Sequence, residues 1–340
     1  MTGPHVATVI FVVLMLSAAA IGLAGYLADS DSASGDTPVG LVPESNNAQL
    51  DARSGSNGAA ESDQPSGSIG WPDAPETSAV SVFAIDTATG EVVYAKNEDE
   101  ERDIASTVKI MTALVTVDFA ELDDEVFIED EDLVDMQVYS NMALFSGDTL
   151  TVEQLLTGLL IPSGSDGALA LARYVGGLID PDSDDPESAF VDAMNARAES
   201  LGMTNSHFTN PDGNDSKNAY SSARDIATAG VELLKQPVLA EIVSQTAYTF
   251  TSVGPEAREY TGVTTNQLLT EGYDGVSGIK TGSTEAAGGC IVVAQENPKS
   301  GSTIVIAVLG SDLTYENGWI AADSRWDDTR ALLAWIDGQK

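Results

Sequence analysis

Histidine and cysteine are almost absent from this 340-residue sequence, which has only His5, His207 and Cys290. One cysteine cannot form a disulfide within the chain. Two histidines leave a histidine-built zinc site or a Ser-His-Asp triad poorly supplied. Cys290 lies in an apolar, strand-like stretch with no base near it in sequence, so we expect a buried core thiol. A serine nucleophile in this chain would therefore need a base other than histidine.

Positive charge is scarce as well. Lysine and arginine together number 15 against 53 aspartates and glutamates, giving a formal net charge of −38. The negative electrostatic field of so acidic a chain repels polyanions, so the composition argues against a nucleic-acid partner. A dense acidic surface could suit a saline habitat or reflect a lineage with acidic extracellular proteins, and both readings stay open. The hydrophobic fraction of 43% is ordinary and allows a sizeable core.

Charged residues are missing altogether from residues 6–28, a run of 23 residues. As a helix it would span ~34 Å, enough for the hydrocarbon core of a bilayer. Signal-peptide cores are usually shorter, about 7–15 residues, so the pattern favours an uncleaved membrane anchor within residues 1–28 over a cleaved signal peptide. The chain would then act outside the cytoplasm, anchored to the cell membrane, or secreted or periplasmic if the segment is cleaved.

Large apolar residues are few between residues 29 and 77, where Ser, Asp, Gly, Ala and Asn predominate. This composition is typical of a disordered linker. As a flexible coil it would span ~35–42 Å root-mean-square, which would let an anchored domain reach well above the lipid. The folded, catalytic domain is predicted over residues 78–338.

Within this domain the hydrophobic pattern places strands at both ends and helices between them, which implies a sheet assembled from distant segments. Ser222 and Asp225 resemble a capping box at the start of one of the helices. The predicted strands are 80–85, 91–95, 248–251, 276–280, 290–295 and 303–309. The predicted helices are 104–118, 152–160, 167–175, 188–201, 223–235 and 326–336.

Ser106 and Lys109 form a Ser-x-x-Lys motif on the first of these helices. Residues three apart share a helix face, so the lysine amine can reach the serine hydroxyl. Apolar neighbours would desolvate the amine and lower its pKa, which suits a general base. Ser106 would be the nucleophile, with its backbone N–H directed at developing negative charge. Alone, this motif is more typical of an ordinary amphipathic helix with one snorkelling lysine.

A second motif, Lys280-Thr281-Gly282, ends a predicted strand and strengthens the first. Lys280, which we expect to stay charged, and the Thr281 hydroxyl could bind an anionic substrate group. Gly282 would allow close approach of the substrate backbone. Ser283 could supply the second N–H of an oxyanion hole, together with that of Ser106. Only seven lysines occur in the chain, so two in linked motifs point to chemistry.

These motifs resemble the serine D-alanyl-D-alanine carboxypeptidases, the small penicillin-binding proteins of the bacterial cell wall. The resemblance runs from about residue 80 to 336 and includes Leu201-Gly202-Met203, His207-Phe208, Asn210-Pro211-Asp212-Gly213, the stretch 220–225 and the stretch 275–279. It implies an α/β (α+β) fold of the β-lactamase/transpeptidase type, with an antiparallel sheet between helical layers. It also implies acylation of Ser106 by the penultimate D-alanine carbonyl of peptidoglycan stem peptides, with β-lactam antibiotics as covalent inhibitors and no cofactor or metal.

One motif departs from the family. Where the family has Ser-x-Asn, this chain has Ser163-Gly164-Ser165. The resemblance implies that Ser163 passes a proton between Lys109 and the leaving amine. Ser165 takes the place of the asparagine that contacts substrate, and a hydroxyl cannot donate and accept as an amide does. If this shortened contact limits the rate, Ser165→Asn should raise it.

Several alternatives stay open. The chain could prefer D,D-endopeptidase activity, or be a non-enzymatic penicillin- or peptidoglycan-binding relative weakened at Ser165. A β-lactamase on the same fold is disfavoured, because the Glu-x-x-Leu-Asn pattern of class A enzymes does not occur. Retention of Lys109, Lys280 and Ser163 argues against a decayed site.

Overall fold

A computed structural model describes residues 73–316 and 319–338. The predicted membrane segment and residues 29–72 of the predicted linker lie outside them. The end of the linker touches the folded part, since Lys96 Nζ donates to Thr77 O at 3.2 Å. The backbone N and Oγ of Ser78 donate to the Asp328 carboxylate at 2.9 and 2.7 Å. Within the described residues, no helix combines the length and apolar character needed to cross a membrane.

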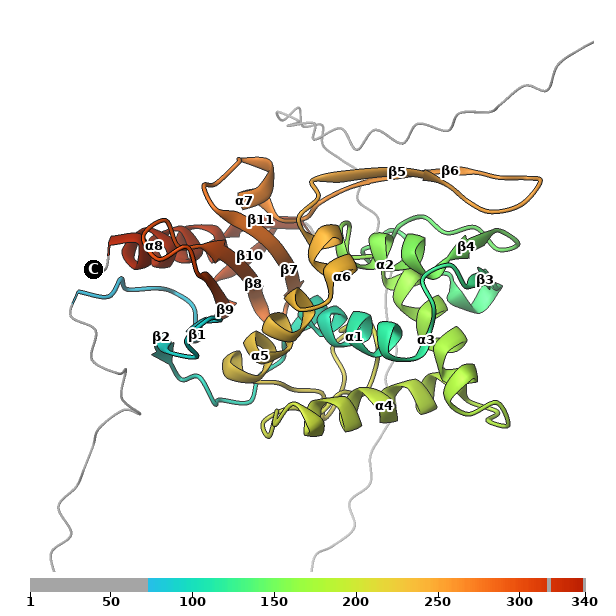
Figure 1. Cartoon of the computed structure of the whole chain (residues 1–340), viewed down its shortest axis with the longest axis horizontal. Helices are drawn as coiled ribbons and strands as arrows, with labels where there is room; N and C mark the ends of the chain where they lie inside the picture. Colours follow the sequence, from blue (N-terminus) through green and yellow to red (C-terminus); the bar gives the residue numbers. More distant parts are fainter. Residues whose placement is uncertain (1–72, 317–318, 339–340) are drawn as a thin grey trace, which may run out of the picture. The chain divides into compact units, whose positions relative to one another are not determined.

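The centre of the fold is a five-stranded sheet whose strand order joins both ends of the chain (Figure 1). All its neighbouring strands pair antiparallel. The order is β2 (Val92–Lys96), β1 (Ser81–Asp86), β9 (Thr303–Ser311), β8 (Gly288–Glu296) and β7 (Val276–Thr284). The predicted N-terminal hairpin and the assembly of the sheet from distant segments are therefore confirmed.

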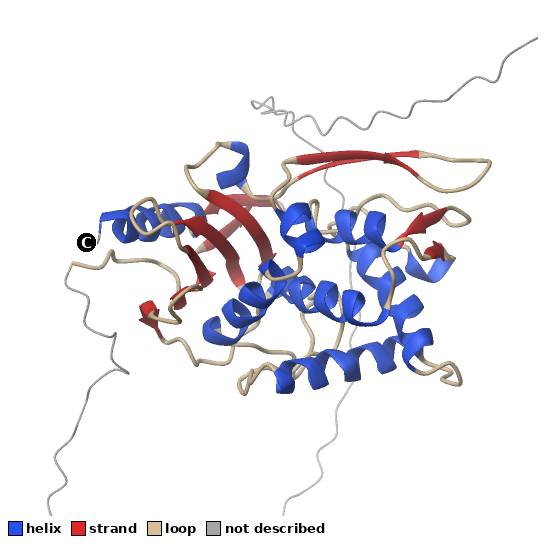
Figure 2. Ribbon diagram, viewed as in Figure 1, coloured by secondary structure: helices blue, strands red, loops and turns tan. Residues whose placement is uncertain are grey.

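Both faces of this sheet are covered. Alternate residues of β8 and β9 belong to two separate apolar clusters, as the two-residue period of a strand requires. One cluster joins Val292 and Ala307 to the main helical layer, and the other joins Ile291 and Ile306 to the C-terminal helix α8 (Arg325–Gly338). Strands buried on both faces read as nearly continuous apolar runs, which is how β8 and β9 read in the sequence. The expected sheet between helical layers is present (Figure 2).

The main helical layer comes from the middle of the chain, as predicted. Its helices are α1 (Lys109–Phe119), α2 (Val152–Leu160), α3 (Ser165–Ile179), α4 (Pro186–Ser200), α5 (Ala223–Leu234) and α6 (Pro237–Val243). In α1 every residue from 109 to 116 is buried. A helix that is apolar on all sides belongs in the core, and α1 carries the lysine of the first motif into it.

The hydrophobic pattern missed most of the smaller elements. Three two-stranded sheets pair β3 (Glu125–Phe127) with β4 (Thr149–Thr151), β5 (Ala247–Thr251) with β6 (Glu259–Val263), and β10 (Leu313–Glu316) with β11 (Trp319–Asp323). A 3-10 turn η2 (Asp130–Asp132) and the short helix α7 (Gln267–Thr270) complete the described structure. Of these, only β5 had a predicted counterpart, because the others are short or polar.

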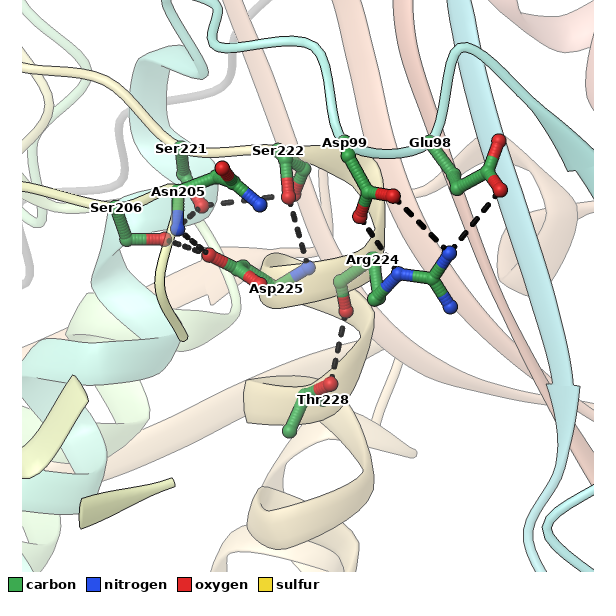
Figure 3. Close-up of polar contacts among 9 residues, drawn as sticks. All are labelled: Glu98, Asp99, Asn205, Ser206, Ser221, Ser222, Arg224, Asp225 and Thr228. Carbon is green, nitrogen blue, oxygen red and sulfur yellow. Dashed lines mark hydrogen bonds and ion pairs between the residues drawn. The ribbon is translucent and has the colours of Figure 1, made fainter. Parts of the chain in front are cut away.

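The predicted capping box at α5 is half correct (Figure 3). Ser222 Oγ accepts a hydrogen bond from the Asp225 backbone N at 3.2 Å, as an N-cap should. The Asp225 carboxylate does not complete the box. It accepts instead from the Asn205 backbone N at 2.7 Å and from Ser206 Oγ at 2.8 Å. Asp225 therefore ties α5 to the segment after α4.

Cys290 is buried in β8, and burial raises the pKa of its thiol to about 11. A thiol with so high a pKa stays protonated and is a poor nucleophile. The prediction of a buried core cysteine is confirmed.

Candidate active site

Ser106 lies in a 3-10 turn, η1 (Ala105–Val108), that leads directly into α1. The sequence predicted one helix over 104–118, so its first turn is corrected. Ala105 adopts φ 47°, in the left-handed region that L-residues rarely enter. Thr107 closes the turn by donating its backbone N and its Oγ1 to Ile104 O at 3.2 and 2.7 Å. Residues three apart eclipse one another in a 3-10 turn, so Ser106 and Lys109 still share one side.

Lys109 is completely buried, and its Nζ has three oxygen neighbours. It donates to Ser106 Oγ at 3.1 Å, to Ser165 Oγ at 3.3 Å and to the main-chain O of Asp212. The first contact is the one that the Ser-x-x-Lys spacing predicted. The other two come from segments more than 50 residues away in sequence, so only the fold brings them to the amine.

Burial lowers the pKa of Lys109 to about 8, while the carboxylates of Asp212 and Asp166 act in the opposite direction. The direction agrees with the predicted desolvation. We expected a neutral amine, but with this pKa only about one amine in ten is unprotonated at pH 7. The neutral fraction reaches about half near pH 8, so the base is available in a useful amount at mildly alkaline pH.

This pKa gives a pH dependence. We expect the rate of acylation of Ser106 to rise with pH and to level off above about 8, because only the unprotonated Lys109 amine can accept the serine proton. The measurement is kcat/KM for a D-Ala-D-Ala peptide across the range from about pH 6 to 9.5. A profile that is flat across this range, or whose rise is complete well below neutrality, would contradict the role of the Lys109 amine.

The Asp212 carbonyl is held in place by its neighbours. Thr112 on α1 donates its Oγ1 to Pro211 O at 2.5 Å, and Gly213 N donates to Asn210 Oδ1 at 2.7 Å. No role for Asp212 followed from the sequence, although the stretch 210–213 was among the family-like motifs. Its contact with Lys109 is through a backbone oxygen, which no residue pattern identifies.

The two serines of the third motif lie at the junction between α2 and α3, and both are buried, at 3% exposure for Ser163 and 4% for Ser165. Ser163 adopts φ 69°, and its Oγ has no hydrogen-bond partner among the described residues. Ser165 is the first residue of α3, and its Oγ contacts Lys109 Nζ. The structure therefore brings Ser165 to the base, and the contact predicted between Ser163 and Lys109 is not among the hydrogen bonds of the described chain.

Asp166, the next residue, fixes the chain around this motif. Its buried carboxylate accepts from the backbone N of Met142 at 2.9 Å and of Leu144 at 3.0 Å. Ser165 N in turn donates to Ser140 O at 2.8 Å. Burial raises the pKa of Asp166, and the backbone donors lower it. These bonds hold the segment 140–144 against the start of α3 and so position Ser165.

Strand β7 carries the second motif along the edge of the sheet. Within it, Lys280 pairs with Val292, and Gly282 pairs with Cys290. The Thr281 hydroxyl is 2.5 Å from that of Thr265. A Cβ built on Gly282 would lie only 2.8 Å from Ser106 N, which places β7 directly against the nucleophile's turn. The oxyanion hole between the N–H groups of Ser106 and Ser283 stays a prediction, made at this junction.

Lys280 is buried at 1% exposure, and its Nζ donates to Thr281 O at 2.9 Å. Burial and the neighbouring charges of Lys109 and Arg325 lower its pKa well below the usual value. We expected Lys280 to stay charged, but this environment disfavours its ammonium form. A bound carboxylate would add the missing negative charge and stabilise the ammonium form.

Arg325 is a part of the site that the motifs did not reveal. It begins α8, is buried, and its Nη1 donates to Gly282 O at 2.6 Å, to Ser283 Oγ at 2.9 Å and to Cys290 O at 3.0 Å. Its Nη2 pairs with Asp323 at 2.5 Å. The guanidinium therefore holds the end of β7 and its neighbour β8. No motif marks it, because an arginine at a helix start is common.

The close approach at Gly282 gives a second prediction. Gly282→Ala should force β7 away from Ser106, because a methyl at 2.8 Å from the backbone N is far inside van der Waals contact. We expect acylation to slow by about tenfold to a hundredfold, since a misplacement near 1 Å can have that effect. The measurement is the rate of penicillin labelling.

The matched control is Gly177→Ala on α3, where a Cβ would have nothing within 4 Å. It should label at the parent rate. If Gly282→Ala labelled at the parent rate, β7 would have room for a methyl group beside Ser106, which contradicts the close contact in the structure.

No group of three or more His, Cys, Asp or Glu side chains in the described part of the chain is arranged to hold a metal ion. A half-buried serine in contact with a buried lysine, beside a Lys-Thr-Gly strand on a sheet between helical layers, defines a serine hydrolase that forms an acyl-enzyme. The sequence model of the D-alanyl-D-alanine carboxypeptidases, peptidase family S11, matches residues 70–312. The chain belongs to this family.

Individual relatives agree. The D-alanyl-D-alanine carboxypeptidase of Streptomyces sp. (strain K15) is 36% identical over 245 residues, 70% of this chain and 82% of the relative. DacB2 of Mycobacterium tuberculosis, also named a D-alanyl-D-alanine carboxypeptidase, is 33% identical over 275 residues, 80% and 86% of the two chains. The crystal structure of the Streptomyces K15 DD-transpeptidase superposes with a TM-score of 0.70 at 32% identity, covering 78% of this chain and 99% of that one.

Proposed function

We propose that this chain is a serine-type D-alanyl-D-alanine carboxypeptidase that removes the terminal D-alanine from peptidoglycan stem peptides. The observation that carries the proposal is the buried Lys109 amine, 3.1 Å from Ser106 Oγ and with a pKa lowered to about 8. Membership of the S11 family supports the same reaction, and the named relatives are D-alanyl-D-alanine carboxypeptidases.

The reaction begins at Ser106. Its Oγ attacks the penultimate D-alanine carbonyl while Lys109 accepts the proton, which forms an acyl-enzyme and releases D-alanine. The N–H groups of Ser106 and Ser283 stabilise the oxyanion, and a water molecule later hydrolyses the ester. Lys280 and Thr281 bind the terminal carboxylate of the substrate, which supplies the anion that the buried Lys280 amine lacks. β-Lactams acylate the same Ser106.

The experiment combines a fluorescent penicillin with a D-Ala-D-Ala peptide. A carboxypeptidase should be labelled covalently and should release D-alanine. Labelling without release would overturn the proposed activity in favour of a penicillin-binding relative, and fast turnover of the penicillin would favour a β-lactamase.

A second activity has one observation in its favour, since the structural neighbour from Streptomyces K15 is named a DD-transpeptidase. Transfer of the acyl group to an amine uses the same Ser106 ester, with the amine in place of water. Adding an acceptor such as glycylglycine to the peptide assay separates the two outcomes. A carboxypeptidase yields mainly the free acid, and a transpeptidase yields the new peptide.

We also propose that the enzyme works outside the cytoplasm, held at the cell membrane through residues 1–28 or free if that segment is cleaved. The support is the uncharged run of residues 6–28 and the external location of a peptidoglycan substrate. Fractionation of cells that express the full chain, followed by N-terminal sequencing, tests both alternatives. Recovery of the intact chain from the cytosol would contradict the proposal.

A further inference from the structure

The two serines of the third motif differ in what they touch, and this difference bears on the proton that must reach the leaving group. Ser165 Oγ lies 3.3 Å from Lys109 Nζ. Ser163 Oγ is buried without a hydrogen-bond partner in the part of the chain that the structure describes. The resemblance to the family implied that Ser163 is the proton carrier and that position 165 contacts substrate.

The contacts of Lys109 match the needs of a proton relay. Protonated, its Nζ has three N–H donors, and it has three oxygen neighbours in Ser106 Oγ, Ser165 Oγ and Asp212 O. Neutral, it keeps two N–H groups for Ser165 and Asp212 and turns its lone pair to Ser106. Ser165 therefore accepts a hydrogen bond from the amine in both states, and it has its own O–H to give.

Position 165 in the family holds an asparagine, whose amide can donate and accept hydrogen bonds but does not exchange a proton at one atom near neutral pH. A hydroxyl can lose one proton while it gains another at the same oxygen. Ser165 is also held rigidly, because Ser165 N donates to Ser140 O and the next carboxylate anchors Met142 and Leu144. The Ser165 hydroxyl is fixed, buried and hydrogen-bonded to the Lys109 amine, so it suits proton transfer better than the Ser163 hydroxyl, which has no hydrogen bond to that amine.

We propose that Ser165, and not Ser163, returns the proton from Lys109 to the leaving nitrogen. In the first step the Ser106 Oγ–C bond forms, and the serine proton moves to Lys109. In the second step the C–N bond breaks and its electron pair stays on nitrogen. That nitrogen takes the proton of Ser165, and Ser165 takes one from the Lys109 ammonium. Both side chains end neutral, and D-alanine leaves as the amine.

This inference rests on the proposed function, and the test separates the two. It compares a D-Ala-D-Ala peptide, whose leaving amine must be protonated, with a thioester analogue, whose thiolate can leave without a proton. In Ser165→Ala, we expect acylation by the peptide to fall by about 10²-fold or more, the usual contribution of a positioned acid. Acylation by the thioester should stay near the parent rate.

Thioester turnover also reports that Ser165→Ala is folded. If that variant fails to fold, Ser165→Asn replaces it, because the family accommodates asparagine at this position. Ser165→Asn should lose peptide activity in the same selective way, opposite to the gain expected from restoring a substrate contact. Ser163→Ala should show no loss that is selective for the peptide over the thioester.

Equal losses with both substrates in Ser165→Ala, or a peptide-selective loss in Ser163→Ala, would overturn the inference and leave the proposed function intact. A faster Ser165→Asn would overturn it too. Failure of the parent protein to form an acyl-enzyme on Ser106 with either substrate would instead overturn the proposed function.

Discussion

Replacing Ser106 with alanine is expected to abolish covalent penicillin binding and to lower kcat for D-alanine release by ~10⁴-fold or more, as for other serine nucleophiles. The reason is that Ser106 Oγ is the hydroxyl beside the buried base, at 3.1 Å from Lys109 Nζ. The fold should survive, because Lys109 keeps its contacts with Ser165 and Asp212. The second hydrogen bond of Ser106, to Asp212 O, is long at 3.5 Å.

The measurement is labelling by a fluorescent penicillin, followed by D-alanine release and a thermal melt. Ser200→Ala removes an exposed serine hydroxyl on α4 and serves as the matched control, with parent-like activity. A Ser106→Ala protein that melts like the parent and still releases D-alanine at a comparable rate would remove Ser106 from the mechanism.

The second large effect is expected at Lys109. Lys109→Met keeps a chain of similar length in the core but removes the amine, so acylation should slow by about 10²- to 10⁴-fold, the range for general bases. Stability should not fall in parallel. The amine is completely buried, and taking it out of water opposes folding, so methionine should leave the melting temperature equal to the parent value or higher.

Stopped-flow acylation and thermal melting test these two expectations together. Lys235→Met is the control, because the side chain of Lys235 is exposed and pairs only with Glu232 at 2.9 Å among the described residues. It should change neither rate nor stability appreciably. An active Lys109→Met would show that Lys109 is not the base. A Lys109→Met chain so unstable that it does not fold would instead show that Lys109 has a structural role.

The long elements of the fold could be predicted because their signals are local. The sequence shows apolar runs at β8 and β9 and helical periodicity in the middle segment. In these elements the local pattern and the tertiary structure favour the same conformation. Short strand pairs such as β3 and β4 have three residues in each strand, too few to show an alternating hydrophobic pattern. The 3-10 turn at Ser106 was missed because it needs φ 47° at Ala105, and alanine gives no hint of it.

The site divides in a similar way. Ser106 and Lys109 are three residues apart, so their contact follows from spacing alone. The contact of Lys109 with Ser165 and that of Gly282 with Arg325 join residues 56 and 43 positions apart, and only the fold creates them. The lowered pKa of Lys280 likewise depends first on its burial in the fold and then on charges from two other elements. The sequence therefore predicted which residues lie together at the candidate site better than it predicted the contacts that they make there.

Peptide mapping of the penicillin adduct tests directly whether Ser106 is the nucleophile of a serine acyl-enzyme. The full chain is treated with benzylpenicillin, quenched, digested and mapped by tandem mass spectrometry. We expect a penicilloyl adduct on Ser106 alone, and its rate of formation should rise with pH as the Lys109 amine loses its proton. An adduct on Ser163 or Ser165, or a folded chain that carries none, would contradict it.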